Sequence, residues 1–259
     1  MKEINRIGEI NFNKFNNKME IIQYKDANNI TVQFESGYKT ETTYHHFING
    51  DTKYPYDRGV HNIGYLGEGD YTFFKGIKAR TIHYKYWTSM LDRCYNPNKL
   101  KIYPTYKNCI VCEEWHNFQN FAKWFDDNYY EIEGERMSLD KDILVKGNKI
   151  YSPDNCVFVS RRINNLFVKC DKARGNFPLG VSYNKLNNNY RACCSVYNLD
   201  INSSYNKKLG SFETPEDAFY KGYKPFKEQY IKEVADKYKD KIPIKLYNAM
   251  YNWKVEITD

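Results

Sequence analysis

The segment of residues 136–168 constrains the fold more than any other part of this 259-residue chain. Its sequence is RMSLDKDILVKGNKIYSPDNCVFVSRRINNLFV, and turn signals at Gly147-Asn148 and at 152–155 divide it into short apolar runs. Short apolar runs bounded by glycine, proline and asparagine are typical of strands. The basic run that follows the last of them suits a helix. We therefore expect a small β-hairpin followed by a helix.

Two elements of this segment could form a site for a divalent cation. Asp140 ends the first expected strand, and Asn164 lies on the expected helix. A carboxylate and an amide on facing elements can hold one Mg²⁺ against a phosphate, with water supplying further ligands. The alternative is a structural role, in which the acids pair with Lys141, Arg161 or Arg162. The residues alone leave both open.

The charge of the chain is unevenly distributed around this segment. Residues 113–135 are acidic, with Lys123 as their only base, whereas bases outnumber acids over 136–174. The formal net charge is +7. This pattern favours a polyanionic partner such as nucleic acid, although a solvated basic face would also account for it.

Two classes of protein are disfavoured by the apolar pattern. No run approaches the roughly 18 apolar residues that a membrane span needs. The first residues, MKEINRIGEINF, lack the apolar core of a signal peptide. We therefore expect no membrane contact and a cytoplasmic location.

The seven cysteines are expected to be reduced thiols in that compartment. Cys109 and Cys112 form one C-x-x-C pair, and Cys94 and Cys156 could complete a four-thiolate zinc site. Structural zinc sites usually show two such pairs, and free cysteine is a common small core residue. We therefore do not expect structural zinc.

The remaining segments predict two further groups of strands and several helices. Residues 19–26, 28–37 and 38–47 alternate apolar and polar side chains, as do 178–184, 188–197 and 205–212. Residues 81–95 and 113–130 have apolar residues at helical spacing, and Asn96-Pro97 ends the first of these helices. The inward-facing residues are expected to be Met19, Ile21, Ile30, Val32, Phe34, Ile82, Tyr86, Trp87, Met90, Leu91, Cys94, Trp115, Phe118, Ala122, Phe125 and Tyr129, with Tyr24 as a further candidate.

The last helix has a clear start signal. Thr214 suits the N-cap and Pro215 the first helical position. Pro225 lies inside the helical pattern and should kink it. The apolar residues 242–259 should pack back on the body.

These elements predict an α+β protein with four parts. Residues 1–70 form a small β-rich domain, and 71–170 form a ββα domain with two preceding helices. Residues 171–240 form a three-stranded sheet with a helix, and 241–259 form the tail.

The third part resembles an AP2 DNA-binding domain over about 174–238. The matching residues are Gly180-Val181, Tyr190-Arg191-Ala192, Leu209-Gly210-Ser211-Phe212, Thr214, Glu216 and Ala218. The resemblance implies a three-stranded sheet packed on one helix, with the sheet entering the DNA major groove. The physical argument agrees, because a β-sheet fits this groove and basic side chains on its outer face reach bases and phosphates.

The second part resembles an HNH (His-Me finger) endonuclease of the branch found in bacteriophages and mobile elements. The pattern comprises Tyr86-Trp87, Met90, Arg93-Cys94-Tyr95, Val111-Cys112, Trp115, Phe118, Phe121, Leu139-Asp140, Gly147-Asn148, Tyr151-Ser152-Pro153, Asn155-Cys156 and Asn164. The resemblance implies that Asp140 binds metal, that Asn155 braces the loop, and that Asn164, or its neighbour Asn165, completes the metal site. It also implies Mg²⁺ as the cofactor of an active enzyme.

The chain departs from this family at the position of the general base. The family has histidine directly after the metal-binding aspartate, and this chain has Lys141. Lysine starts with a pKa near 10.4, about three pH units above what a base near neutral pH needs. The adjacent acids would favour its charged form. The catalytic set Asp140, Lys141, Asn155 and Asn164 is therefore expected to be inactive or weakly active.

Three functional hypotheses follow. The first is a phage-type protein, in a bacterial cytoplasm, that binds double-stranded DNA and derives from an HNH homing endonuclease. The second is an active Mg²⁺-dependent nickase or endonuclease. The third is a phage protein that binds and inhibits a host protein. The candidate DNA-binding residues are Arg161, Arg162, Arg174, Lys185, Arg191, Lys207 and Lys208.

Overall fold

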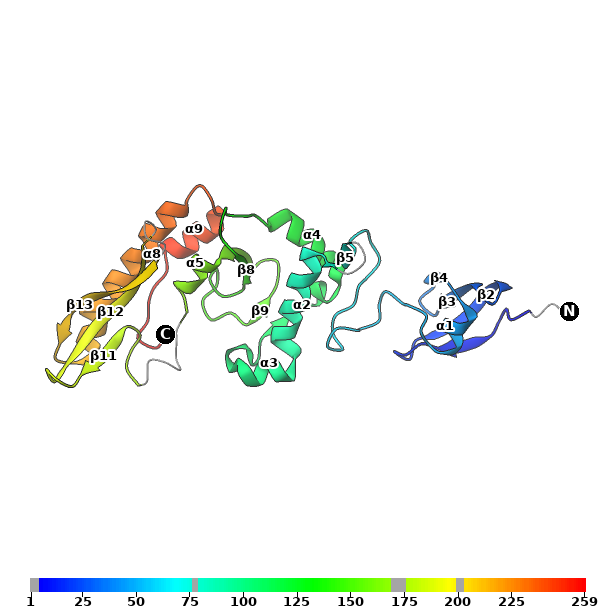
Figure 1. Ribbon diagram of the computed structural model, residues 1–259, viewed down its shortest axis with the longest axis horizontal. Coiled ribbons are helices and arrows are strands. Elements are labelled where there is room, and N and C mark those ends of the chain that lie inside the picture. Colours follow the sequence, from blue (N-terminus) through cyan, green and yellow to red (C-terminus); the bar gives the residue numbers. More distant parts are fainter. Residues whose placement is uncertain (1–4, 76–78, 169–175, 199–202) are drawn as a thin grey trace. The chain divides into compact units, whose positions relative to one another are not determined.

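A computed structural model describes residues 5–75, 79–168, 176–198 and 203–259 (Figure 1). It shows a mixed α+β protein that divides into two compact units. Unit 1 comprises Met1–Asp127 and Ile150–Ser152, and unit 2 comprises Asn128–Lys149 and Pro153–Asp259. Among the helices in the described ranges, none combines the length and apolar character that a bilayer-spanning segment needs.

Unit 1 begins with a four-stranded antiparallel sheet. Its strands, in spatial order, are β1 (Ile10–Phe12), β2 (Lys18–Asp26), β3 (Asn29–Phe34) and β4 (Lys39–Thr42). The five residues that alternation placed inward, from Met19 to Phe34, are each at most 2% exposed and pack with Phe47. The alternation therefore identified the covered face correctly.

The predicted third strand is shorter than expected. Residues 38–47 were expected to be extended throughout, but Tyr44–Ile48 form helix α1. Thr43 is the cause, because its side chain accepts a hydrogen bond from the His46 backbone amide at 3.1 Å and caps the helix. This turn brings Phe47 onto the sheet.

The rest of unit 1 is mainly helical. Its elements are β5 (Phe74–Lys75), β6 (Ala79–Arg80), α2 (Ile82–Tyr95), α3 (Pro97–Ile102), η1 (Pro104–Tyr106), β7 (Ile110–Val111), η2 (Glu113–His116), α4 (Phe118–Asn128) and β9 (Ile150–Tyr151). On α2, Trp87, Met90 and Leu91 are fully buried, but Ile82 is 39% exposed, contrary to expectation. Ile82 is the first helical residue, just after the cap Thr81.

The second predicted helix is divided at Asn117. Its side chain accepts from the Gln119 backbone amide at 2.9 Å, so Asn117 starts α4 and separates it from η2. The predicted apolar stripe is buried from Trp115 to Phe125. Tyr129 lies beyond the end of α4 and is only half-buried.

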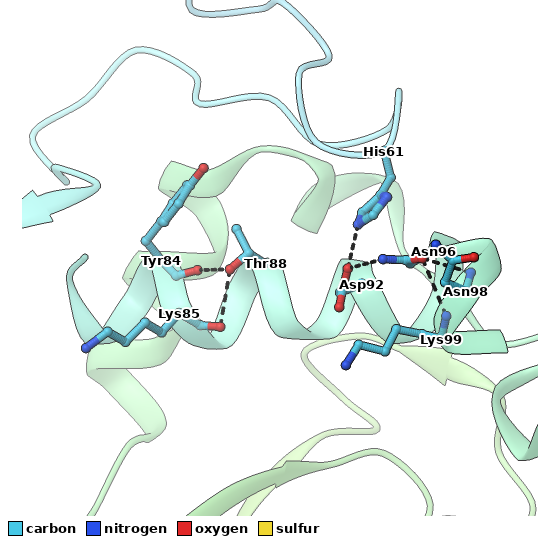
Figure 2. A network of polar contacts seen from close by, with 8 residues as sticks. All are labelled: His61, Tyr84, Lys85, Thr88, Asp92, Asn96, Asn98 and Lys99. Carbon is cyan, nitrogen blue, oxygen red and sulfur yellow. Dashed lines mark hydrogen bonds and ion pairs between the residues drawn. The ribbon is translucent and has the colours of Figure 1, made fainter. Parts of the chain in front are cut away.

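Figure 2 shows how a connecting loop is tied to α2. Asp92 Oδ1 lies 3.0 Å from His61 Nε2 and accepts a hydrogen bond from Asn96 Nδ2 at 2.8 Å. Asn96 Oδ1 accepts from the Asn98 amide at 2.9 Å and thereby caps α3. The predicted end of the helix at Asn96-Pro97 is confirmed, and the same residues begin the next helix.

Unit 2 begins with a strand–strand–helix arrangement. Strands β8 (Met137–Asp140) and β10 (Val157–Ser160) pair antiparallel, with Asp140 opposite Val157. Helix α5 (Arg161–Asn165) follows directly and packs on both strands. Residues Ile150 and Tyr151, expected in the hairpin, instead pair in parallel with β7 as β9.

The C-terminal sheet has the three predicted antiparallel strands. They are β11 (Val181–Asn184), β12 (Asn189–Asn198) and β13 (Ser203–Phe212), in that spatial order (Figure 1). Strand β11 pairs only with the first four residues of β12, whereas β13 pairs with β12 from Tyr190 to Asn198. Beyond Ala192, one edge of β12 is therefore not covered by β11.

The last predicted helix forms as a sequence of segments covering one face of this sheet. They are α7 (Pro215–Asp217), the π-helical η3 (Ala218–Tyr223) and α8 (Lys224–Tyr238). Thr214 caps the first, since its side chain accepts from the Asp217 amide at 3.1 Å. The π-helical segment ends two residues before Pro225, which lacks the N–H that the Lys221 carbonyl would otherwise accept.

The tail packs on unit 2, as predicted. Helix α9 (Ile244–Tyr251) lies against α8 and buries Leu246 and Met250 completely. Lys146 Nζ contacts Asp259 Oδ2 at 2.7 Å and lies 5.2 Å from the centre of the Trp253 ring.

Candidate nucleic-acid interface and the strand–strand–helix site

The two faces of the C-terminal sheet differ in character. Ala192 and Phe212 lie on the helical face, where their side chains surround the position a Cβ of Gly222 would take. Arg191 points the other way and is directly opposite Ser182 and Ser211 in the neighbouring strands. All three are exposed. We call this the outer face of the sheet.

Arg191 is held in place on the outer face. When the Asn184 amide is assigned with its oxygen toward Arg191, as the donors around it require, that oxygen accepts from Arg191 Nε and Nη2 at 3.2 and 2.7 Å. Asn184 itself is 8% exposed. Since arginine carries five N–H donors in a planar fork, this contact orients the guanidinium and leaves donors for a further partner. Sequence patterns do not indicate this supporting asparagine, because the pair depends on strand register.

The two adjacent lysines of β13 lie on opposite faces. Lys208 is opposite Cys193 and is exposed on the outer face, as is Arg191. Lys207 is opposite the buried Cys194, and its ammonium lies 4.8 Å from the centre of the Phe226 ring on α8. Alternation along a strand explains the difference. Only Lys208 of this pair is placed with Arg191.

The other candidate DNA-binding residues are spread over unit 2. Lys185 is exposed in the turn between β11 and β12. Arg161 is exposed at the start of α5. Arg162 lies 3.4 Å from Glu135 and 4.6 Å from the Tyr197 ring centre. Arg174 lies outside the described residues.

In the strand–strand–helix site, Asp140 stabilises the loop that follows β8. Its Oδ1 accepts from the backbone amides of Asp142 and Ile143 at 2.9 and 2.8 Å. Burial and the neighbouring Asp142 carboxylate raise the pKa of Asp140 to about 6. Because Asp140 Oδ1 accepts these two backbone hydrogen bonds, Oδ2 is the oxygen of this carboxylate that is left to bind a metal ion.

Lys141, at the position of the family's general base, is buried and ion-paired. It is 5% exposed, and its Nζ lies 3.0 Å from Asp142 Oδ2. An adjacent carboxylate stabilises the ammonium form, which cannot accept a proton. The sequence placed acids on both sides of Lys141 but did not show which of them it contacts.

Asn155 takes part in bracing this loop through a second asparagine. Its Nδ2 donates to Asn148 Oδ1 at 3.4 Å, and Asn148 Nδ2 donates to the Lys141 carbonyl at 2.6 Å. Asn148 was seen in the sequence only as a turn residue. The Asn164 side chain is half-buried on α5, and within the described ranges it makes no hydrogen bond to Asp140.

Over the residues that the structure describes, no group of three or more His, Cys, Asp or Glu side chains is arranged to hold an ion. Mg²⁺ can bind through one or two carboxylates with water and phosphate, so Asp140 and Asn164 stay its predicted ligands. Three of the cysteines considered for zinc, Cys94, Cys109 and Cys156, are buried.

Comparisons of the chain with protein-family models, with curated proteins and with solved structures find no match.

Proposed function

We propose that the protein binds double-stranded DNA through the outer face of the β11–β13 sheet. The observation that carries this proposal is the position of Arg191 and Lys208, which are exposed on one face while the helices cover the other. An antiparallel sheet can enter the major groove, roughly 12 Å wide, and a guanidinium can then contact guanine. Lysine at such a face more often contacts phosphate.

The orientation of Arg191 supports this proposal further. A guanidinium held by Asn184 loses less conformational entropy on binding than a free side chain. Ser182 and Ser211 flank it in register and have hydroxyls that can bond to phosphates or bases. Exposed Lys185 in the adjoining turn extends the positive charge. The strand–strand–helix site adds Arg161 as a further backbone contact.

We propose in addition that the bound DNA is not cut. The general base of a one-metal nuclease must be neutral near pH 7, and the Lys141 ammonium is paired with Asp142. Asp140 gives one carboxylate oxygen to the backbone of its own loop. In this proposal the strand–strand–helix site serves as a scaffold that contacts the DNA backbone.

An electrophoretic mobility assay with a 30-base-pair duplex at about 50 mM salt tests the binding proposal. We expect Arg191→Ala combined with Lys208→Ala to weaken binding at least tenfold. Lys39→Ala, on the exposed face of the N-terminal sheet, is the matched control and should leave binding unchanged. Wild-type protein that fails to shift the duplex, or a double variant that binds normally, would reject the proposal.

Incubation of supercoiled plasmid with the protein and Mg²⁺ or Mn²⁺ tests the statement on cleavage. We expect no relaxed or linear product. Nicking that disappears in Asp140→Ala would contradict us and would support the nickase hypothesis. Nicking that persists in Asp140→Ala would come from elsewhere.

A further inference from the structure

Unit 2 contains a cavity of about 650 Å³ whose wall includes Arg161 but neither Arg191 nor Lys208. It lies at the edge of β12 that β11 leaves uncovered, between α5 on one side and α8 on the other. Its volume falls in the range of roughly 300–1,000 Å³ that is typical of small-molecule sites. We call it the β12-edge cavity.

The charge of the β12-edge cavity is strongly asymmetric. Among the described residues of its wall, the basic side chains are Arg136, Arg161, Arg162, Lys227 and Lys237, and the acidic one is Glu135. Arg136, Arg161 and Lys237 are exposed, whereas Lys227 is 7% exposed. Such an arrangement favours an anionic ligand, whose charge the exposed bases at the opening can bind.

Aromatic rings complete the wall. Tyr197, Tyr223, Tyr230 and Tyr238 all line the cavity. Tyrosine rings provide flat apolar surfaces on which a planar heterocycle can stack. An anion that also carries a planar ring therefore fits this wall better than inorganic phosphate does.

Glu135 supplies a specific acceptor. Its Oε1 accepts from the Tyr238 hydroxyl at 2.5 Å and lies 3.4 Å from Arg162 Nη1. Its Oε2 is buried and has no hydrogen-bond partner among the residues the structure describes. A buried carboxylate oxygen without a donor is costly, and a ligand N–H would satisfy it.

We infer that the β12-edge cavity binds a nucleoside 5′-monophosphate whose base carries an exocyclic amino group. The phosphate contacts Arg161 and its basic neighbours, the base stacks on tyrosine, and the amino group donates to Glu135. The nucleotide is either free in solution or extruded from bound DNA, and the chemistry of recognition is the same. This inference goes beyond duplex binding by the outer face and does not depend on Arg191 or Lys208.

Calorimetric titration of the full chain with matched nucleotides tests the inference. The pair dCMP and dUMP differs by an amino group against a carbonyl at one position, and dAMP and dIMP differ in the same way. We expect the amino member of each pair to bind at least tenfold tighter. Equal binding within both pairs would overturn the role of Glu135.

Two variants test separately the contact of the base with Glu135 and the contact of the phosphate with Arg161. Glu135→Gln keeps one acceptor for Tyr238 and replaces the other oxygen by an amide, so the preference for dCMP over dUMP should vanish or invert. Glu133→Gln, an exposed acid two residues away, is the control and should keep the preference. Arg161→Ala should weaken dCMP at least fivefold and leave deoxycytidine unchanged. Circular dichroism confirms that each variant is folded.

A duplex containing 2-aminopurine distinguishes the two sources. A rise in its fluorescence on binding identifies a nucleotide extruded from DNA, and no rise together with dCMP binding identifies the free nucleotide. The inference is overturned if no mononucleotide binds and the fluorescence does not rise. If the double variant Arg191→Ala, Lys208→Ala loses duplex binding but binds dCMP as the wild type does, the result supports duplex binding by the outer face and leaves the inference about the β12-edge cavity intact.

Discussion

The N-terminal and C-terminal sheets are built in the same way but differ on their exposed faces. Each is antiparallel, and each buries one face against a helix that follows its last strand. On the N-terminal sheet, Glu20, Gln33 and Lys39 lie side by side across three strands, so acid and base balance. On the C-terminal sheet, Ser182, Arg191 and Ser211 occupy the corresponding row.

This difference shows that the covered face and the exposed face are under separate physical constraints. The covered face must exclude water and fit its helix, and both sheets satisfy this mainly with small or apolar residues, with Lys207 as an exception that lies against the Phe226 ring. The exposed face contributes little to stability, so its charge can be set by a partner. We therefore expect core changes to affect the two sheets through packing, and charge changes to affect DNA binding only at the C-terminal sheet.

The largest expected effect comes from a glycine at the start of the C-terminal sheet. Gly180 has φ +75°, and a Cβ there would lie 2.0 Å from the Tyr223 ring. Gly37, in the β3–β4 turn of the N-terminal sheet, has φ +89° but open space around it. Gly180→Ala should cost about 2–4 kcal/mol, because strain and overpacking add. Gly37→Ala should cost about 1 kcal/mol, from strain alone.

Hydrogen–deuterium exchange of the full chain measures this pair, because it reports on each sheet separately. Peptides from β11 and β12 should exchange much faster in Gly180→Ala, with β2 and β3 unchanged. Equal losses of protection in the two variants would show that Tyr223 does not restrict this position.

The next largest effect distinguishes the two faces of strand β13. Lys208→Ala should weaken duplex binding and reduce the salt dependence of log K by about one unit, as for the loss of one phosphate contact. Lys207→Ala should leave binding unchanged and lower the stability of unit 2 by about 0.5–1 kcal/mol, since its ammonium lies over the Phe226 ring.

Titrations at several salt concentrations and thermal unfolding test this pair together. If Lys207→Ala were to reduce the salt dependence as much as Lys208→Ala does, the assignment of faces would be wrong. The N-terminal control Lys39→Ala should change neither quantity.

The sequence predicted the covered faces well, because alternation and helical spacing are local properties. Met19, Val32, Trp87 and Leu91 are buried as expected, and the cap Thr214 is in place. Local signals failed where a short element leaves no periodicity. The five-residue helix α1 shows none, and its only signal was the capping side chain of Thr43.

The candidate sites were less predictable, because they depend on contacts between distant segments. The order of strands and helix placed Asp140 and Lys141 correctly in the loop after β8. The ion pair of Lys141, the support of Arg191 by Asn184 and the position of Glu135 beside Tyr238 depend on how the chain folds back. In the sequence, Glu135 belongs to the acidic stretch 113–135, and its neighbours do not indicate a cavity.

The smallest expected effect concerns the hairpin turns of the two sheets. Asp26, in the β2–β3 turn, accepts from the Asn29 side chain at 2.9 Å and from the Asn28 amide at 2.7 Å. These hydrogen bonds lower the pKa of Asp26. The corresponding β11–β12 turn, Lys185 to Asn188, contains no carboxylate. Only the N-terminal turn should therefore respond to acid.

The direction of this response follows from the lowered pKa. The stabilisation from Asp26 is present above its unfolded pKa of about 3.9 and is lost as the pH falls through the lower folded value. The Asn28 amide resonance should follow this titration in NMR spectra, with a midpoint below that of a model peptide, and Asp26→Asn should abolish the change. A titration midpoint at or above the peptide value would show that the two hydrogen bonds do not favour the Asp26 carboxylate. A similar pH response of the amides in the β11–β12 turn would show that the two sheets do not differ in this respect.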